Sequence, residues 1–502
     1  MGPFRGMWRW LTGGDRKTKP AAPRSETPAT AYKKGDFIGK PYEVLGVLGV
    51  GGFSTVYLVH SHETGTAFAL KTLRDKFLQD PETADQFKRE ARVWVNLERH
   101  PNIVTAHFID ELAGRLYIGM EYIAPNNDGL NSLEGYLAAD PPDLPQALRW
   151  CIQFCHGMEH SRSRGIRSHR DIKPANIMIT ANGVVKITDF GFADVIDRTR
   201  RLSMDAISRR KRMAQDFTGF GTPNYMPPEQ FLNASRCDER SDIYSFGVVM
   251  YQLVSGGRLP FVPPAVSGQR RARPNVWRDM HRLHTEARPP ALASPLFSII
   301  KRCLEKEQRA RYQSFRELRV DLEALLAETS GEKVVIEAPK ELQAWELYNK
   351  AFSLASLGDH GEAIKYYDRV LELEPSNSDA WNNRGSCCKK LGKVQDALQC
   401  YENAIHVQPY NASAWSNKGN ALSALGKYTE AIVSLNRAIE VDPANESAWL
   451  NKALVEDRLG LVREAVSSFQ KFVDLEPVSY SEHIEYARKR IAELIRTHKV
   501  KC

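Results

Sequence analysis

The chain has 502 residues, of which 42% are hydrophobic and 26% charged, and its formal net charge is +8 at pH 7. A chain of this length is too long to fold around one hydrophobic core, so we expect two or three domains. The composition is that of an ordinary globular protein. No apolar run approaches the ~20 residues of a membrane-spanning helix. The eight cysteines show no paired CxxC spacing, which predicts buried free thiols in a reducing compartment, the cytoplasm, rather than a metal site.

Residues 1–40 are predicted to form a flexible basic arm. Residues 12–38 are rich in Lys, Arg, Pro, Thr and Ala and have little apolar content, so they cannot bury a core. The first eleven residues include Arg5, Trp8, Arg9 and Trp10 but lack the apolar region and cleavage site of a signal peptide. Trp and Arg suit a headgroup boundary, so peripheral membrane contact stays open beside the simpler interpretation as a tail.

The next segment predicts a phosphate-binding turn. Apolar runs flank Gly49-Val50-Gly51-Gly52-Phe53-Ser54-Thr55-Val56, which predicts two strands joined by a glycine-rich turn. Lys71 follows on the next strand, and its apolar neighbours favour an ammonium aimed at a site over one in solvent. Glu90 lies on a helix about twenty residues later, where it can orient Lys71, although a lone Glu on a helix is more often a surface charge.

The most informative stretch is His169-Arg170-Asp171-Ile172-Lys173-Pro174-Ala175-Asn176-Ile177-Met178, followed by Asp189-Phe190-Gly191. In this order after the glycine turn, the two motifs resemble the catalytic loop and metal-binding triplet of protein kinases. The resemblance covers about residues 42–327. It implies a fold of the α+β class, a bilobal protein kinase domain that we place at residues 41–328.

The resemblance also implies ATP as the phosphoryl donor, with Mg²⁺ or Mn²⁺. Asp171 would accept the proton of the substrate hydroxyl, and Lys173 would steady the γ-phosphate and is typical of serine/threonine kinases. The implied catalytic residues are Asp171, Lys173, Asn176, Lys71, Glu90 and Thr222, and the implied metal ligands are Asn176 and Asp189. The implied nucleotide contacts are Gly49, Gly51, Gly52, Phe53, Ser54, Val56, Ala69, Lys71, Met120, Glu121, Ile123 and Met178.

Further matches lie downstream of the catalytic loop. Residues 221–229 resemble the substrate-facing loop of serine/threonine kinases, with Pro227 in place of the usual Ala. In the family, Asp242 would brace the catalytic loop, and Arg311 would form a structural ion pair with Glu229.

Between Gly191 and Gly221 the chain is long and basic, with seven Lys and Arg residues around Ser203 and Ser208. Arg170 before the catalytic Asp commonly accompanies control by phosphorylation. A phosphate on Ser203, Ser208, Thr218 or Thr222 could order this activation segment by pairing with arginines. A preference for acidic substrates, or simply a solvated charge run, also stays open.

After a polar connector at 329–342, residues recur at a period of 34: Gly358, Gly392, Gly426 and Gly460; Ala363, Ala397, Ala431 and Ala465; Pro375, Pro409, Pro443 and Pro477. The Gly suits a left-handed helix end, the Ala a close helix contact and the Pro a helix stop. The pattern resembles four tetratricopeptide repeats over 343–478, which implies an all-α solenoid. A last helix within 479–502 is predicted to cap it.

A second column consists of Asn349, Asn383, Asn417 and Asn451, each followed by Lys or Arg. In the repeat family, first helices line a concave groove. The column resembles the asparagine ladder of O-linked N-acetylglucosamine transferase, which holds an extended peptide backbone. The alternative is a set of ordinary polar residues on a solvated face.

Two functions compete. The first is an active serine/threonine protein kinase, similar to bacterial signalling kinases, that phosphorylates protein substrates and its own activation segment while the repeats recruit substrates or regulators. The second is a pseudokinase scaffold, although the residues that pseudokinases lose are all present: Lys71, Glu90, Asp171, Asn176 and Asp189. Nucleic-acid binding has no supporting fold motif and is not expected.

Overall fold

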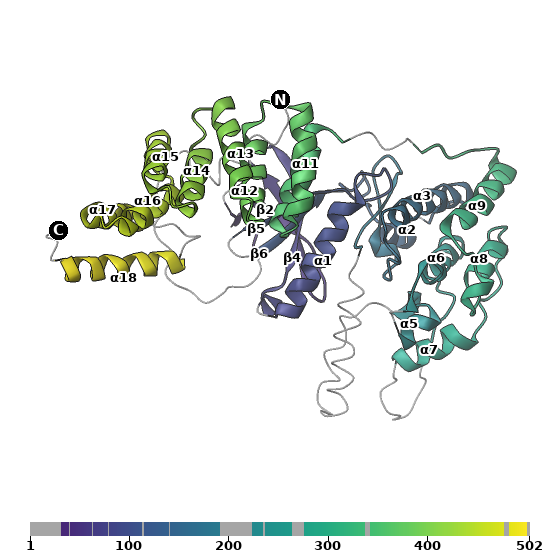
Figure 1. Cartoon of the computed structure of the whole chain (residues 1–502). Coiled ribbons are helices and arrows are strands. Elements are labelled where there is room, and N and C mark those ends of the chain that lie inside the picture. The colour runs from purple at the N-terminus through teal and green to yellow at the C-terminus, as the bar shows by residue number, and fades with distance from the viewer. Residues whose placement is uncertain are drawn as a thin grey trace, which may run out of the picture.

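The computed structural model describes residues 32–39, 41–62, 64–78, 80–112, 115–139, 141–190, 223–233, 236–263, 276–336, 342–475 and 481–498. A sheet-rich lobe and a helical lobe are followed by a row of paired helices, which starts beside the sheet and runs away from the helical lobe (Figure 1). The predicted architecture, an α+β bilobal domain followed by an all-α solenoid, is confirmed.

The N-terminal lobe is a six-stranded antiparallel sheet in the order β1-β2-β3-β4-β6-β5. Its strands are β1 (Phe37–Ile38), β2 (Tyr42–Val50), β3 (Ser54–Ser61), β4 (Thr66–Leu73), β5 (Ala106–Leu112) and β6 (Arg115–Glu121). The helix α1 (Pro81–Leu97) follows β4. It begins where the Asp80 side chain accepts a hydrogen bond from the backbone N–H of Thr83, with Pro81 in the first turn.

The predicted boundary of the arm is wrong at its end, because residues 32–39 belong to this lobe. Tyr32 packs edge-on against Tyr57, with ring centroids 5.6 Å apart. The backbone N–H of Gly35 donates to the carbonyl of Val44 at 2.8 Å, and β1 pairs with β2. The polar composition of this segment gave no sign of a strand. Backbone pairing and one aromatic contact are enough to hold it in place.

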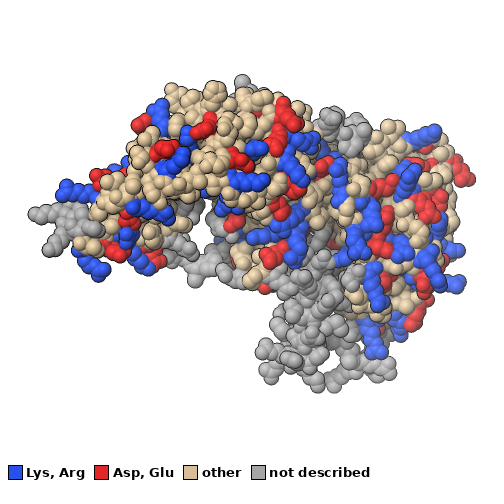
Figure 2. All heavy atoms as spheres, viewed as in Figure 1, with Lys and Arg blue, Asp and Glu red and all other residues tan. Residues whose placement is uncertain are grey.

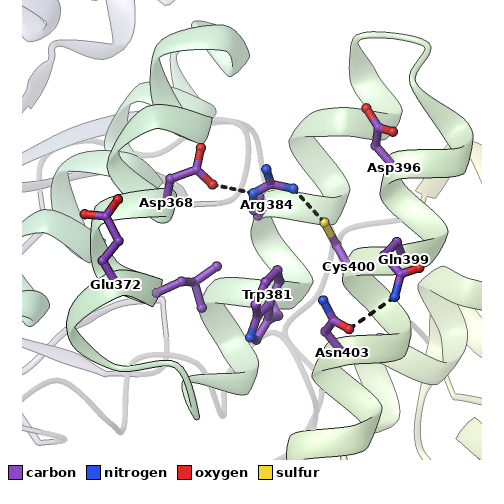
Figure 3. A pocket seen from close by; sticks show the side chains of 9 residues that line it. Asp368, Glu372, Trp381, Arg384, Asp396, Gln399, Cys400 and Asn403 are labelled. Carbon is purple, nitrogen blue, oxygen red and sulfur yellow. Dashed lines mark hydrogen bonds and ion pairs between the residues drawn. The ribbon is translucent and has the colours of Figure 1, made fainter.

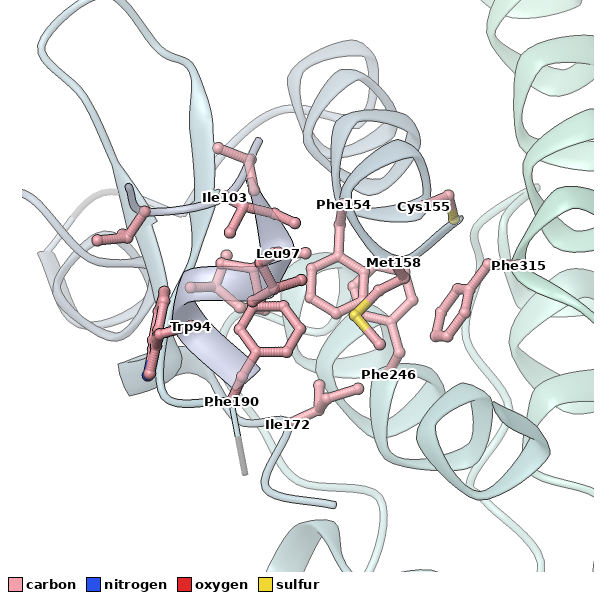
Figure 4. Packing of buried hydrophobic residues seen from close by; sticks show 14 of the residues in the cluster. Trp94, Leu97, Ile103, Phe154, Cys155, Met158, Ile172, Phe190, Phe246 and Phe315 are labelled. Atoms are coloured by element: carbon pink, nitrogen blue, oxygen red, sulfur yellow. The ribbon is translucent and has the colours of Figure 1, made fainter. Parts of the chain in front are cut away.

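The C-terminal lobe is mainly helical and contains a short hairpin. Its helices are α2 (Leu133–Ala139), α3 (Leu144–Ser163), α5 (Pro228–Leu232), α6 (Glu239–Val254), α7 (Val276–Glu286), α8 (Phe297–Cys303) and α9 (Phe315–Ser330), and its hairpin is β7 (Ile177–Ile179) with β8 (Val185–Ile187). The helix α6 is buried along almost its whole length. Phe154 of α3 stacks on Phe246 of α6, with ring centroids 4.0 Å apart (Figure 4). The cysteines that the structure describes are free and buried, as predicted.

The repeat array consists of helix pairs. The pairs are α10 (Ala344–Ser356) with α11 (His360–Leu373), α12 (Ser378–Lys390) with α13 (Val394–Val407), α14 (Ala412–Ala424) with α15 (Tyr428–Val441), and α16 (Glu446–Arg458) with α17 (Val462–Asp474). The glycine column has φ between 72° and 86°, the left-handed region that explains why Gly recurs there. The alanine column is fully buried. Each Trp from Trp381 onward donates its indole N–H to the carbonyl of the preceding Pro, at 2.9–3.0 Å.

The last helix, α18 (Ser481–His498), covers the end of the array. Its Ala487 and Leu494 are buried in one cluster with Phe469 and Phe472 of α17. Arg490 forms an ion pair with Asp457 at 2.8 Å. Across the described ranges, no helix has both the length and the apolar character to cross a membrane.

We predict that the close contact at Gly419 makes Gly419→Ala destabilising. A Cβ atom there would lie 2.6 Å from Cγ of Leu435 and 3.1 Å from the carbonyl oxygen of Ala431. Such overpacking costs about 1–3 kcal/mol. Hydrogen exchange of the α14 and α15 amides would measure the loss.

Gly361→Ala is the matched control, because its added methyl meets no atom within 4 Å. Its expected effect is neutral, or stabilising by up to ~1 kcal/mol. Equal amide protection in the two variants would contradict the close-packing argument.

Candidate active site

Lys71 is buried at the junction of three segments. It lies on β4, opposite Val56 of β3 and Ile118 of β6. Its Nζ atom is 2.9 Å from Oε1 of Glu90 on α1 and 2.7 Å from Oδ1 of Asp189, which follows β8. Two carboxylates thus compensate an ammonium that is only 2% exposed, as a buried charge requires.

Burial and charge act against each other in this cluster. Burial raises the pKa of Glu90 to about 7, even though Lys71 opposes the shift. Burial alone would lower the pKa of Lys71, but Asp189 and Glu90 more than offset it, so the ammonium stays charged. Desolvation likewise opposes ionisation of Asp189, yet the Lys71 ammonium holds the pKa of this carboxyl below its ordinary range.

The Asp171 carboxylate accepts hydrogen bonds from two side chains of its own loop. Lys173 Nζ lies 2.8 Å from Oδ2 of Asp171, and Asn176 Nδ2 donates to the same oxygen at 2.9 Å. Asn176 Nδ2 also donates to the Asp171 carbonyl at 2.8 Å, because a 3-10 turn at Pro174–Asn176 folds the chain back. The loop therefore sets the orientation of the Asp171 carboxylate before any substrate arrives.

Asp242 braces this loop, as predicted. Its carboxylate accepts hydrogen bonds from the backbone N–H groups of His169 and Arg170, at 2.7 and 2.9 Å, and from Oγ of Ser168 at 3.0 Å. Burial raises the pKa of Asp242 to about 6. Arg170 and Asp189 have φ of 64° and 63°, a left-handed backbone that side chains disfavour and that surrounding contacts must hold.

The predicted ion pair beneath the substrate-facing loop is present. The guanidinium of Arg311 is fully buried and donates to both oxygens of Glu229, at 2.8 and 3.0 Å. This bidentate geometry makes the pair a structural one.

The donor set fits a magnesium ion shared with a nucleotide. Asn176 uses its Nδ2 on Asp171, which leaves its amide oxygen as a ligand atom, and Asp189 offers a carboxylate. The N–H of Thr188 donates to the Asn176 carbonyl at 3.1 Å, which ties the two ligand segments together. Among the residues that the structure describes, no three His, Cys, Asp or Glu form a metal cluster. Mg²⁺ commonly takes one or two protein ligands and completes its shell with phosphates and water.

Most predicted nucleotide contacts come from adjacent strands. Ala69 of β4 and Met120 of β6 are opposite in register and buried. Phe53 differs, because it is buried within the lobe and its ring centroid lies 4.9 Å from that of Phe77. Burying a large apolar side chain at a turn in such a contact stabilises the fold more than leaving it exposed to water. Thr222, Gly191 and the candidate phosphorylation sites lie outside the described residues.

Sequence reasoning missed two supporting residues. Trp94 of α1 packs edge-on against Phe190, with ring centroids 5.6 Å apart (Figure 4). Arg74 donates to the carbonyls of Gly51 and Gly52 at 3.4 Å and so holds the glycine turn. The apolar face of a helix could have marked Trp94, but nothing local marks Arg74.

The asparagine column is not an open ladder. Asn383 donates to the Tyr348 hydroxyl and Asn417 to Oδ1 of Asn382, both at 2.9 Å, so these amides join successive first helices. Asn451 accepts a hydrogen bond from Asn420 at 2.8 Å. Asn349 is 2% exposed, and its amide has no hydrogen-bond partner among the described residues. The prediction fails at Asn349 and Asn383 because packing between helices buries them.

A groove of about 800 Å³ lies elsewhere in the array, between the second helices α11 and α13 and over α12 (Figure 3). Arg384 forms an ion pair with Asp368 at 2.6 Å and donates to Sγ of Cys400 at 3.0 Å. Glu372 and Asp396 add two carboxylates, and Trp381 adds an aromatic surface. The lining therefore holds three carboxylates against one guanidinium.

Comparisons with known proteins agree with this geometry. The family profile described as the protein kinase domain matches residues 42–320, and the tetratricopeptide repeat profile matches 344–377, 378–411 and 412–445. The fourth pair, α16 and α17, follows the third at the same period.

Curated relatives include bacterial kinases. A probable serine/threonine-protein kinase of Streptomyces coelicolor is 36% identical over 58% of this chain and 40% of its own length. The serine/threonine-protein kinase PknB of Mycobacterium leprae is 35% identical over 60% of this chain and 44% of its own length. A probable serine/threonine-protein kinase of Clostridium perfringens is 30% identical over 58% and 39%. The chain thus spans about two fifths of the length of these relatives.

The raised pKa of Glu90 predicts a pH-dependent stability difference between the wild type and Glu90→Gln. The pKa rises from an ordinary 4.5 to about 7 on folding, so the folded state binds the extra proton between these values. The free energy of unfolding of the wild type, relative to Glu90→Gln, should therefore fall as the pH rises through this window and level off above it.

Urea unfolding of both proteins at several pH values would measure this difference. Glu485→Gln serves as the control, because Glu485 is exposed and its pairing with Lys489 lowers its pKa, out of this window. A difference that stays constant from pH 4.5 to 7 would mean that burial does not shift Glu90.

Proposed function

Because the chain belongs to the protein kinase family over residues 42–320 and carries tetratricopeptide repeats, we propose that it is an ATP-dependent serine/threonine protein kinase whose repeats bind a protein partner. The observation that carries the proposal is the assembled site: Lys71 contacts both Glu90 and Asp189 while Asp171 is oriented by its loop. This arrangement of charged groups is one that phosphoryl transfer could use, and it supports the proposal.

The reaction requires positioning and charge stabilisation. When bound, Mg-ATP supplies the γ-phosphoryl group and the metal charge that offsets it, with Asn176 and Asp189 as the ligands. Lys173 and Asn176 both donate to Oδ2 of Asp171, which leaves Oδ1 to accept the proton of the incoming hydroxyl. Lys71, oriented by its ion pair with Glu90, would hold the phosphates that stay behind.

Several observations favour catalysis over a silent scaffold. A pseudokinase has no need to bury a compensated Lys71 or to hold two left-handed residues at the site. Lys173 and the similarity to bacterial serine/threonine-protein kinases favour Ser and Thr as acceptors. Phosphorylation of the activation segment by the enzyme itself remains part of the proposal, with Ser203, Ser208, Thr218 and Thr222 as candidates.

For the repeats we propose recruitment of a substrate or regulator protein. The groove at α11, α12 and α13 holds excess carboxylate and an indole, which favours a basic partner segment over an acidic one. Over the described residues of the face in Figure 2, Lys and Arg are interspersed with Asp and Glu.

We predict that Asp171→Asn lowers phosphate transfer from labelled Mg-ATP onto the chain or onto a generic basic protein by about 10²- to 10⁴-fold. Binding of ATP should persist in this variant, since Asp171 does not hold the nucleotide. Asp189→Ala should lose both transfer and the magnesium dependence of nucleotide binding.

Asp474→Asn, at an exposed end of α17, is the control and should match the wild type. Label in the wild type but not in Asp171→Asn, followed by mapping of the labelled residues, would support the proposal. A folded wild type that binds ATP and transfers nothing, with or without a partner for the repeats, would refute it.

A further inference from the structure

The first helix of the array packs on the N-terminal lobe. β5 is an edge strand, so alternate backbone groups on its outer side have no neighbouring strand. The helix α10 covers this edge, and the N–H of Ile109 donates to Oγ of Ser353 at 2.9 Å. Leu347, Ala351 and Leu354 of α10 join the same buried cluster as Trp94 and Val95 of α1. The array and the lobe thus share one core.

A single guanidinium of α1 holds the turn between α10 and α11. Nε of Arg92 lies 2.6 Å from Oδ2 of Asp359, and its Nη2 donates to the carbonyl of Leu357 at 2.8 Å. Leu357 directly follows the last residue of α10, and Asp359 directly precedes α11. A carbonyl at a helix C-terminus carries partial negative charge. The Leu357 carbonyl and the Asp359 carboxylate therefore both attract the Arg92 guanidinium.

A second contact lies at the end of α1. Lys350 Nζ is 2.9 Å from Oε1 of Glu98, and the Lys350 side chain is only 8% exposed. The other oxygen of Glu98 pairs with Arg164 at 2.7 Å, so Glu98 joins the array to both lobes. Burial opposes the charge on Glu98, but the hydrogen bond from Lys350 holds its pKa below the ordinary range. Arg99 adds an ion pair with Glu346 at 3.1 Å.

The Arg92 contact lies on the opposite side of α1 from the site. Residues two apart in an α-helix point in nearly opposite directions, so Glu90 reaches Lys71 while Arg92 reaches the array. The position of α1 decides whether the Glu90 carboxylate meets the Lys71 ammonium. The helix is therefore clamped between β4 on one side and the first repeat on the other.

We propose that the first repeat positions Glu90, with Arg92 and Lys350 as positioning residues, and that release of the repeat from α1 weakens nucleotide engagement. This inference rests on the proposed kinase function. It extends that function by making the repeat array part of the machinery that orders the site, in addition to any partner it recruits.

The test compares Lys350→Ala with Lys418→Ala. The two lysines occupy the same place in the repeat, and Lys418 pairs with Glu402 at 3.0 Å inside the array, away from α1. In Lys350→Ala and in Arg92→Ala we expect the KM for ATP to rise about five- to thirtyfold, with a smaller change in kcat. Hydrogen exchange of the α1 amides should become faster in these two variants and stay unchanged in Lys418→Ala.

Charge reversal tests whether Arg92 and Asp359 act as a pair. Arg92→Asp and Asp359→Arg should each impair ATP engagement, and the double variant should recover it in part, because the reversed pair can form again. Recovery would show that the loss in each single variant comes from the Arg92–Asp359 pair.

The outcomes distinguish this inference from the proposed function. A wild type that transfers phosphate, with Lys350→Ala and Arg92→Ala equal to it in KM and in exchange, overturns the positioning role and leaves the kinase intact. A wild type without transfer refutes the kinase function, and the exchange of the α1 amides then decides the positioning role by itself.

Discussion

The buried pair of Lys71 and Glu90 is the constraint on which the N-terminal lobe depends. An isolated ammonium or carboxylate in a protein interior is strongly unfavourable, so each needs the other at hydrogen-bond distance. The two residues come from different elements, β4 and α1, and Asp189 arrives from the other lobe. The cluster therefore forms only when three conditions hold together. The strand register must be correct, α1 must be in place, and the two lobes must approach each other.

The helix α1 transmits this constraint to the rest of the molecule. On its inner side Trp94 packs against Phe190, which in turn contacts His169 of the catalytic loop with ring centroids 4.7 Å apart. Figure 4 shows the apolar side chains continuing from there to α3 and α6. On its outer side the first repeat packs on the same helix. A change at either surface acts on one rigid element, because close-packed interiors deform little.

Ion pairs join neighbouring repeats of the array. Each repeat contacts mainly its neighbours, so the fold propagates in one direction from the kinase lobe. Ion pairs of one type link successive repeats: Arg384 with Asp368 and Lys418 with Glu402. In the first repeat Lys350 has no preceding repeat to pair with and binds Glu98 of the kinase lobe. The kinase lobe thus takes the place that a preceding repeat would occupy.

Sequence alone determined the features that rest on short-range chemistry. The catalytic loop around Asp171 and the period of Gly358 and its counterparts are local patterns, because a tight turn, a metal ligand or a helix end requires one residue type at one spacing. From these patterns followed the bilobal fold, the solenoid, the bracing by Asp242 and the pair of Arg311 with Glu229.

Tertiary structure alone decided the contacts between distant segments. Nothing local in the sequence indicates that Arg92 meets Asp359, that Asn349 is buried, that Phe53 is buried in the lobe or that Phe37–Ile38 joins the sheet. These contacts depend on which surfaces come together after the helices and strands have formed. A periodic column shows which face of a helix its residues share, but only packing determines what covers that face.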